Sequence, residues 1–276
     1  MTWRAVVAAL DESELLRSRV SVYRHPLGGR SILWHAVRAL LDVDPPPSEV
    51  CVVHRAATPL TVDDDWPGVT FTPVDAGDDA RALRAAVTWP GMTVLVDGAA
   101  PLISPQTVAR LLRAAESGVA TLRDGREHAG RIAVAGEGPA LASADDPRVP
   151  QGAARVAPTA PVELIRVSDR HTLSMAAVAV RDRVVRSHEA VGVSFLLPDT
   201  TWVDVDVRIG ADTLIYPGVV LEGATRIGSE CVIGPHTRLI EATIGRGVEL
   251  KGWNYITRTS VRNHAVLEPY ERRGLD

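Results

Sequence analysis

An aliphatic residue recurs at six-residue steps through the last third of the chain, with two steps of five. This period fits neither an α-helix nor a lone alternating strand. It fits a prism-shaped coil in which each short flat strand points one aliphatic side chain inward. A glycine follows four of these anchors, where the backbone must turn a corner without a Cβ clash. At three anchors per coil, the twelve positions predict about four coils: Val203, Ile209, Ile215, Leu221, Ile227, Ile233, Leu239, Ile244, Leu250, Ile256, Val261 and Leu267.

Length and composition describe a folded chain of two units. The 276 residues exceed one typical domain, and 46% hydrophobic residues allow a sizeable core. A net charge of −4 gives no basic footprint for nucleic acid, and no stretch has the roughly 20 apolar residues of a membrane span. The sequence starts without a secretory signal pattern, and Cys51 and Cys231 suit buried thiols in a reducing compartment. We therefore expect a cytoplasmic protein that binds neither nucleic acid nor membrane.

Strand and helix patterns alternate before the coil, which indicates a parallel sheet with flanking helices. Ser104 and Pro105 are typical of an N-cap and a first helical residue. The stretch 135–161 is rich in Pro, Gly and Ala and is expected to be mostly loop. A helix over 169–189 is expected to lead into the coil. The other expected strands are 3–9, 49–54, 69–74 and 93–96, and the other helices are 31–41, 79–87 and 105–116.

Three segments resemble a known enzyme family. Residues 201–256 are similar to the linker and first coils of bifunctional N-acetylglucosamine-1-phosphate uridyltransferase/glucosamine-1-phosphate acetyltransferase. Upstream, HPLGGRSILWHAVRAL (25–40) resembles the family segment HPLAGRPMLEHV, and VSDRHTL (167–173) resembles VNDRxQL. The resemblance implies an α/β nucleotidyltransferase-like domain of Rossmann type, followed by a short left-handed parallel β-helix of hexapeptide repeats. In the full enzyme it implies UTP, magnesium, acetyl-CoA and amino-sugar phosphates.

The resemblance also implies a domain layout and an assembly. We expect a nucleotidyltransferase-like domain over 1–168, a linker helix and connector over 169–200, and the β-helix over 201–276. The β-helix implies a homotrimer, since packed prisms would cover flat outer faces. The segment VLEPYERRG (266–274) resembles the family's IGPFARLRPG, after which the full enzyme continues through its acetyltransferase coils. We therefore expect a C-terminally truncated relative without acetyltransferase activity.

The phosphate-binding opening of the family is not matched. The family has LAAGxGTRMxSxxPK, whose glycine amides and basic side chains bind nucleotide phosphates. This chain has Leu-Asp-Glu-Ser-Glu at 10–14, and Lys251 in the coil is the only lysine of the sequence. Arg17 and Arg19 are the cations that could substitute, although arginine is not equivalent to lysine.

The metal-binding signature is also altered. In the family a strand ends GDxPL, and the Asp holds the catalytic magnesium. This chain keeps Gly98 but has Ala99 at the Asp position. Asp97 lies two residues from Ala99, on the same face of the strand, and is the remaining candidate ligand. Ser168 replaces the Asn of VNDR, the family's other metal ligand.

Three hypotheses follow from these departures. The first is a degenerate family member, a pseudoenzyme without cofactor, that acts as an oligomeric scaffold or binding protein. The second is a magnesium-dependent sugar-1-phosphate nucleotidyltransferase rebuilt around Asp97 and the two arginines. The third is a sensor that binds a sugar nucleotide without reacting it. The candidate nucleotide-binding residues are Gly77 (matching QxxGTxHA), Gly98, Gly130 (matching YGRI), Arg17 and Arg19.

Overall fold

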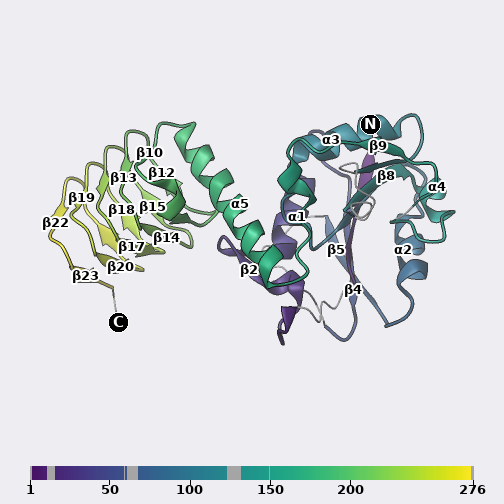
Figure 1. Cartoon of the computed structure of the whole chain (residues 1–276), viewed down its shortest axis with the longest axis horizontal. Coiled ribbons are helices and arrows are strands. Elements are labelled where there is room, and N and C mark those ends of the chain that lie inside the picture. Colours follow the sequence, from purple (N-terminus) through teal and green to yellow (C-terminus); the bar gives the residue numbers. More distant parts are fainter. Residues whose placement is uncertain are drawn as a thin grey trace. The chain divides into compact units, whose positions relative to one another are not determined.

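The computed structural model describes residues 2–10, 16–58, 60, 68–122, 132–148 and 150–274. The chain divides into two compact units. The first holds the sequence up to Ala176, except for residues 27–30, and the second holds those four residues together with everything from Ala177 onward. The division falls within the long helix α5 (Arg170–Glu189), which Figure 1 shows in green.

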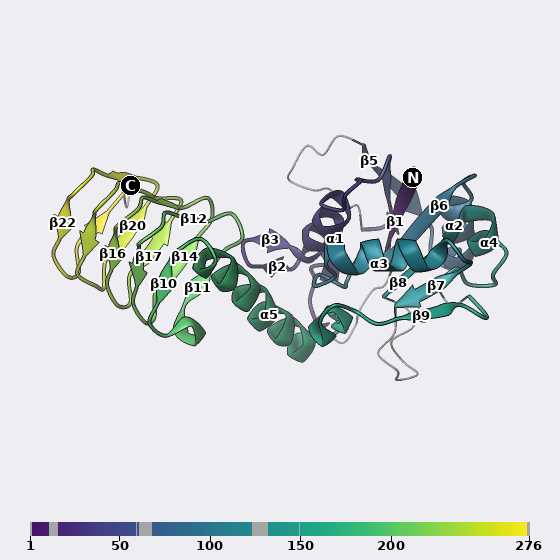
Figure 2. The same cartoon turned by 90° about the horizontal axis from the view of Figure 1, so that it is seen from above.

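A seven-stranded sheet forms the centre of the first unit (Figure 2). Its first four strands are parallel, and the three inner ones bury nearly all their side chains, as in a sheet covered on both faces. The strand β8 runs antiparallel to both of its neighbours. In spatial order the strands are β5 (Val69–Val74), β4 (Val50–Arg55), β1 (Trp3–Ala9), β6 (Met92–Asp97), β8 (Ala133–Glu137), β7 (Ala120–Leu122) and β9 (Ala154–Val156).

Helices cover both faces of this sheet. Two of them pack together on one face and the other two on the opposite face (Figure 1). The predicted serine N-cap is confirmed, because Ser104 Oγ accepts the amide of Thr107 at 3.2 Å. The first pair is α1 (Ile32–Leu41) and α3 (Pro105–Ala115), and the second pair is α2 (Asp79–Val87) and α4 (Gly138–Ala142).

The stretch 135–161 is more ordered than its proline content predicts. It contains the end of β8, the whole of α4 and β9, and the start of the 3-10 helix η3 (Pro161–Leu164). The strand β8 is ordered because it pairs with β6, where Ala135 lies opposite Val94. Such partners are distant in the sequence, so local composition underestimates the order.

A buried carboxylate organises the segment after β9. Glu163 is 2% exposed. One of its oxygens accepts hydrogen bonds from the amide and the hydroxyl of Ser104, both at 3.0 Å. The other oxygen accepts from the Ala160 amide at 3.1 Å and from the Thr159 hydroxyl. Four charge-assisted bonds offset the cost of burying the charge and join this segment to the start of α3.

The second unit is a coil with three flat parallel faces, as in a left-handed parallel β-helix. The predicted anchors point inward; Ile215, Ile233 and Leu250, for example, are 0% exposed. The coil begins one strand before Val203, at β10, where Phe195 is in register with Ile215. The first face contains β10 (Ser194–Phe195), β13 (Leu214–Ile215), β16 (Val232–Ile233), β19 (Glu249–Leu250) and β22 (Val266–Leu267). The second contains β11 (Trp202–Val203), β14 (Val220–Glu222), β17 (Arg238–Ile240), β20 (Tyr255–Thr257) and β23 (Arg272–Arg273). The third contains β12 (Arg208–Ile209), β15 (Arg226–Ile227), β18 (Thr243–Ile244) and β21 (Ser260–Val261).

The corners of the coil are turned by residues in the left-handed region. Asp212, Glu230, His236 and Gly247 lie two positions beyond the four predicted glycines, which serve a different purpose. A Cβ on Gly228 would lie 2.7 Å from the backbone nitrogen of Arg246 in the next coil, so this glycine allows two coils to approach closely. The left-handed residues form three rows, Asp212, Glu230, Gly247 and His264; Gly218, His236, Trp253 and Tyr270; and Gly223, Glu241, Arg258 and Gly274.

A Gly-Gly turn from the N-terminal sequence packs on the first coil within the second unit. It joins β2 (Pro26–Leu27) to β3 (Arg30–Ser31), and Gly28 and Gly29 have φ values of +56° and +84°. Two successive positive φ angles match a type I′ hairpin, which glycine adopts without strain. The Val205 amide donates to the Gly28 carbonyl at 3.0 Å.

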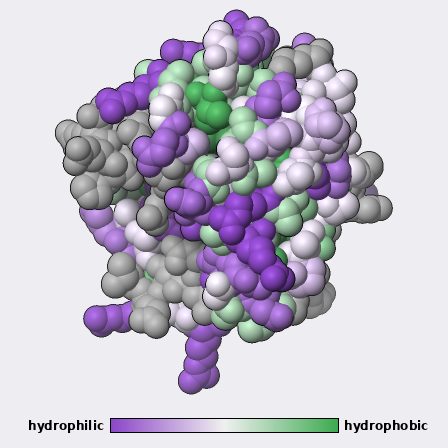
Figure 3. Space-filling view, turned by 90° about the vertical axis from the view of Figure 1, so that its right-hand side faces the viewer, coloured by the Kyte–Doolittle hydropathy of each residue, from purple (hydrophilic) through white to green (hydrophobic). Residues whose placement is uncertain are grey.

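On the face drawn in Figure 3, hydrophilic and hydrophobic residues are interspersed, with one small strongly hydrophobic spot. Isolated apolar residues of this kind are normal on a protein surface. Among the described helices, none is both long and apolar enough to cross a membrane.

Candidate functional site

Three parallel strands of the first unit, β4, β1 and β6, end side by side. In open α/β sheets, ligands bind beyond the carboxyl ends of the strands. Asp97 is the last residue of β6 and lies in register with Ala8 of β1. The predicted metal ligand is therefore at the edge where this fold binds ligands.

Both carboxylate oxygens of Asp97 are engaged by the protein itself. Oδ1 accepts the Ala99 amide at 2.8 Å, and Oδ2 lies 2.5 Å from Nε of Arg166. The side chain of Asp97 is only 13% exposed. Arg166 neutralises the carboxylate and gives Oδ2 a strong donor. Sequence reasoning missed this arginine, whose one signal is its position two residues before Ser168 in the family-like segment.

Two further ion pairs lie near the same edge. Arg55, the last residue of β4, forms a bidentate pair with Asp79 of α2 at 2.6 and 2.9 Å. Arg148 pairs with Asp146 at 2.8 Å. The hydrogen bonds that Arg148 donates to Asp146, together with the charges of Asp146, Asp79 and Asp97, raise the pKa of the Arg148 guanidinium. Arg148 is therefore within electrostatic range of all three carboxylates, and each of these carboxylates already has a guanidinium partner.

The two predicted glycines in the described part of this domain have different surroundings. Gly77 lies in an exposed turn between β5 and α2, has φ +91°, and has open space where a Cβ would be. Gly98 is buried, and a Cβ there would lie 3.2 Å from the side chains of Leu33 and Val7. Packing alone accounts for Gly98, whereas the Gly77 backbone is accessible.

The two arginines proposed as substitute cations are exposed. They follow Leu16, which is buried and whose carbonyl accepts a hydrogen bond from Arg170 Nε at 3.1 Å. Arg17 adopts φ +47°. Within the described ranges, neither Arg17 nor Arg19 forms an ion pair with Asp97. The predicted Gly130 and the acidic segment 11–14 lie outside the described residues.

The described residues do not fit a magnesium site. They include no group of three His, Cys, Asp or Glu side chains that could hold a metal ion. The backbone amide of Ser168 donates to the Thr172 hydroxyl at 3.0 Å, which ties this residue to the first turn of α5. Magnesium takes carboxylate oxygens with near-octahedral geometry, and Asp97 bonded to Arg166 is a poor source of them.

The coil matches a known repeat family and a group of curated proteins. The model described as bacterial transferase hexapeptide (six repeats) matches residues 206–240. Bifunctional protein GlmU of Caldanaerobacter subterraneus subsp. tengcongensis is 39% identical over 108 residues, which is 39% of this chain and 23% of the relative. Its counterpart in Mycolicibacterium smegmatis is 46% identical over 84 residues, 30% of this chain and 17% of the relative. These alignments span less than a quarter of each relative.

The first unit matches by fold. A nucleotidyl transferase from Methanothermobacter thermautotroptrophicus superposes with a TM-score of 0.53 at 20% identity, over 67% of this chain and 99% of that one. At this identity the likeness concerns the fold alone. The chain thus combines a nucleotidyltransferase fold with a GlmU-like hexapeptide region, and the expected fold class is confirmed.

Proposed function

We propose that this GlmU-like chain is a pseudoenzyme, a relative of sugar nucleotidyltransferases that acts as an oligomeric scaffold or binding protein. The observation that carries the proposal is the Asp97–Arg166 pair. It places a guanidinium on the carboxylate that would otherwise bind the metal. Nucleotidyl transfer depends on metal and cationic groups that offset charge on the phosphates.

The charges around Asp97 support the same proposal. A phosphate-binding edge needs unpaired cations or free amides, whereas Arg55, Arg148 and Arg166 each have a carboxylate partner. Breaking such a pair to bind a nucleotide would leave a carboxylate beside the phosphates. The edge therefore resembles an internally neutralised surface more than a catalytic site.

Self-association is part of the proposal. The coil exposes aromatic side chains at one row of corners, with Trp253 47% and Tyr270 68% exposed. Trp253 and Tyr270 stack on each other, with ring centroids 5.7 Å apart. A homotrimer through the β-helix would cover such residues. Light scattering on the purified chain should give three times the mass of one chain, and a monodisperse monomer would refute this part.

Pyrophosphate release from UTP and N-acetylglucosamine-1-phosphate with magnesium tests the loss of activity. We expect no release from the parent and no saturable Mn²⁺ binding by electron paramagnetic resonance. Arg166→Met removes the guanidinium from Asp97 and should increase Mn²⁺ binding, which Asp97→Ala combined with it should abolish. Release by the parent that disappears in Asp97→Ala would overturn the pseudoenzyme proposal and favour a rebuilt transferase.

A second binding measurement separates the scaffold from the sensor. Calorimetry with UDP-N-acetylglucosamine in the absence of magnesium should give no heat for a pure scaffold. Saturable binding without turnover would instead support a sensor that uses the exposed backbone at Gly77. Gly77→Val should then weaken binding, because a β-branched residue is strained at φ +91°.

A further inference from the structure

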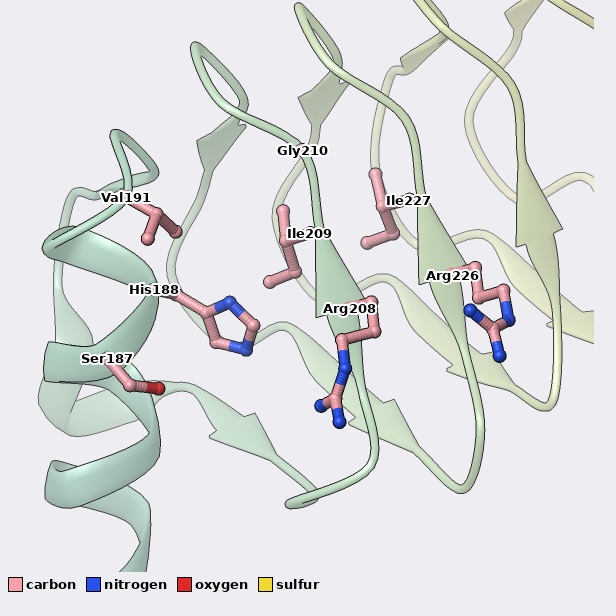
Figure 4. Close-up of a pocket in the computed structure, with 8 residues that line it drawn as sticks. All are labelled: Ser187, His188, Val191, Arg208, Ile209, Gly210, Arg226 and Ile227. Atoms are coloured by element: carbon pink, nitrogen blue, oxygen red, sulfur yellow. The ribbon is translucent and has the colours of Figure 1, made fainter.

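A hollow of about 460 Å³ opens on the second unit, whereas Asp97 belongs to the first. It lies between the last turn of α5 and the strands β12 and β15 of the coil (Figure 4). Its walls combine aliphatic and cationic side chains, namely Ser187, His188, Val191, Arg208, Ile209, Gly210, Arg226 and Ile227. Every residue of this lining belongs to the second unit.

Two arginines stand side by side in this hollow. Arg208 and Arg226 are register partners on adjacent parallel strands, so their side chains leave the same face. Neighbouring strands lie about 4.8 Å apart, and like charges placed directly opposite each other are unfavourable. The same row continues with Thr243 and Ser260, so it contains no acidic residue in the coils that follow. Figure 4 shows both guanidinium groups extending to the same side.

Four other cations of the coil, Arg238, Arg246, Lys251 and Arg258, each pair with an acid one coil away. Arg246 pairs with Glu230, for example, and Arg258 pairs with Glu241 at 2.8 Å. Arg208 instead donates to the carbonyls of residues 205 and 207 at 3.1 and 3.0 Å. Within the described ranges, no carboxylate forms an ion pair with Arg208 or Arg226. The hollow therefore carries two positive charges that the protein does not balance there.

A buried histidine faces the same space. His188 is 8% exposed, and its ring lies between α5 and Arg208 in Figure 4. Burial, with a smaller effect of the Arg208 charge, lowers the pKa of the ring, which favours neutral imidazole. Across the described part of the chain, this ring has no hydrogen-bond partner. An oxygen atom in the hollow could accept a hydrogen bond from its N–H.

The carboxyl-terminal end of α5, which carries the negative end of the helix dipole, repels an anion only weakly. The Val191 amide donates to the His188 carbonyl at 3.1 Å, and the Gly192 amide donates to the Glu189 carbonyl at 3.0 Å. These hydrogen bonds satisfy carbonyls that would otherwise contribute most to the negative end of the helix. The nearest charges lining the hollow are then those of the two arginines.

We propose that this hollow binds the phosphate group of a small phosphorylated ligand, held by Arg208, Arg226 and His188. Guanidinium groups bind phosphate oxygens through paired, charge-assisted hydrogen bonds, and two in register present donors to one tetrahedral anion. The neutral imidazole supplies a further N–H. The aliphatic walls from Ile209 and Ile227 leave room for an organic part of the ligand. This site is independent of the proposed function of the first unit.

Isothermal titration with inorganic phosphate tests the site on the full chain at constant ionic strength. We expect saturable binding with a dissociation constant at or below about 1 mM. Arg226→Gln removes an exposed guanidinium that makes no ion pair in the described structure, and it should weaken binding about tenfold or more. His188→Leu should weaken it less, because it removes a neutral donor and not a charge.

Two control variants locate the binding. Arg246→Gln makes the same charge change elsewhere on the coil, and Asp97→Ala alters the first unit; both should bind phosphate like the parent. Circular dichroism checks that each variant is folded. Heat that does not saturate would overturn the proposal, and so would equal weakening by Arg226→Gln and Arg246→Gln, which would indicate diffuse charge attraction.

Discussion

Replacing an inward anchor of the coil by alanine provides a direct test of the six-residue architecture. Ile233 is 0% exposed and stacks in register between Ile215 and Leu250 of the adjacent coils. Ile233→Ala removes three carbon atoms from a continuous aliphatic column. Since the neighbouring coils are held by strand pairing on both sides, the column has little freedom to collapse into the space.

The expected loss follows from burial and cavity terms. At about 0.8 kcal/mol for each buried carbon, transfer alone costs about 2.4 kcal/mol. A residual cavity of roughly 50 Å³ at about 24 cal/mol per Å³ adds about 1.2 kcal/mol. Ile233→Ala should therefore destabilise the coil by about 3 to 4 kcal/mol. The control is Val266→Ala on the same face, where a side chain 55% exposed should change stability by less than about 0.5 kcal/mol.

Amide hydrogen exchange of coil peptides is the suitable assay, because the two units need not unfold together. The free energy of opening in the coil should fall by about 3 to 4 kcal/mol, a rise in the amide exchange rate of roughly two to three orders of magnitude. Peptides of the first unit should be unchanged. A loss below about 1 kcal/mol, or one equal to that of Val266→Ala, would refute the inward column.

Three further predictions concern other parts of the chain. Gly228→Ala should cost about 1 to 3 kcal/mol, measured by exchange in the coil, because the new Cβ would press on the backbone of Arg246. The lowered pKa of His188 means that the unfolded chain takes up a proton more readily below the ordinary value of 6.5. Coil stability should therefore be full above about pH 6.5 and fall as the pH drops below it, and a urea series in His188→Gln should show a shallower fall. Glu163→Gln should destabilise the first unit by about 2 to 4 kcal/mol, as measured by amide hydrogen exchange. The glutamine NH2 group would face N–H and O–H donors that now donate to a carboxylate oxygen.

Each of these three predictions has an outcome that contradicts it. Equal amide hydrogen exchange rates in Gly228→Ala and the parent would show that the spacing between coils can increase without loss of stability. An acid-side slope unchanged by His188→Gln would assign that slope to other titratable groups of the coil. A Glu163→Gln variant as stable as the parent would mean that the four hydrogen bonds contribute little.

The candidate site was only partly predictable from the sequence. Asp97 was predicted at the end of a strand, and β6 does end there. Its partner Arg166 lies 69 residues away, and no periodicity or spacing connects the two. The same holds for Arg55 and Asp79, which meet because β4 and α2 pack together. Residue types along a chain suggest which groups could act, but ion pairs between distant segments decide which groups remain available.

The sequence by itself determined the repeating architecture and most local elements. The anchors are spaced so that each coil places one side chain inward on each face, and this rule operates between neighbours along the chain. Tertiary structure alone decided which charges are balanced. The 18-position spacing of Arg208 and Arg226 follows from three six-residue steps, but whether an acid from another segment pairs with them depends on the folded chain. The physical reason is that the period of the aliphatic anchors depends only on spacing along the sequence, whereas charge balance depends on which distant residues folding brings together.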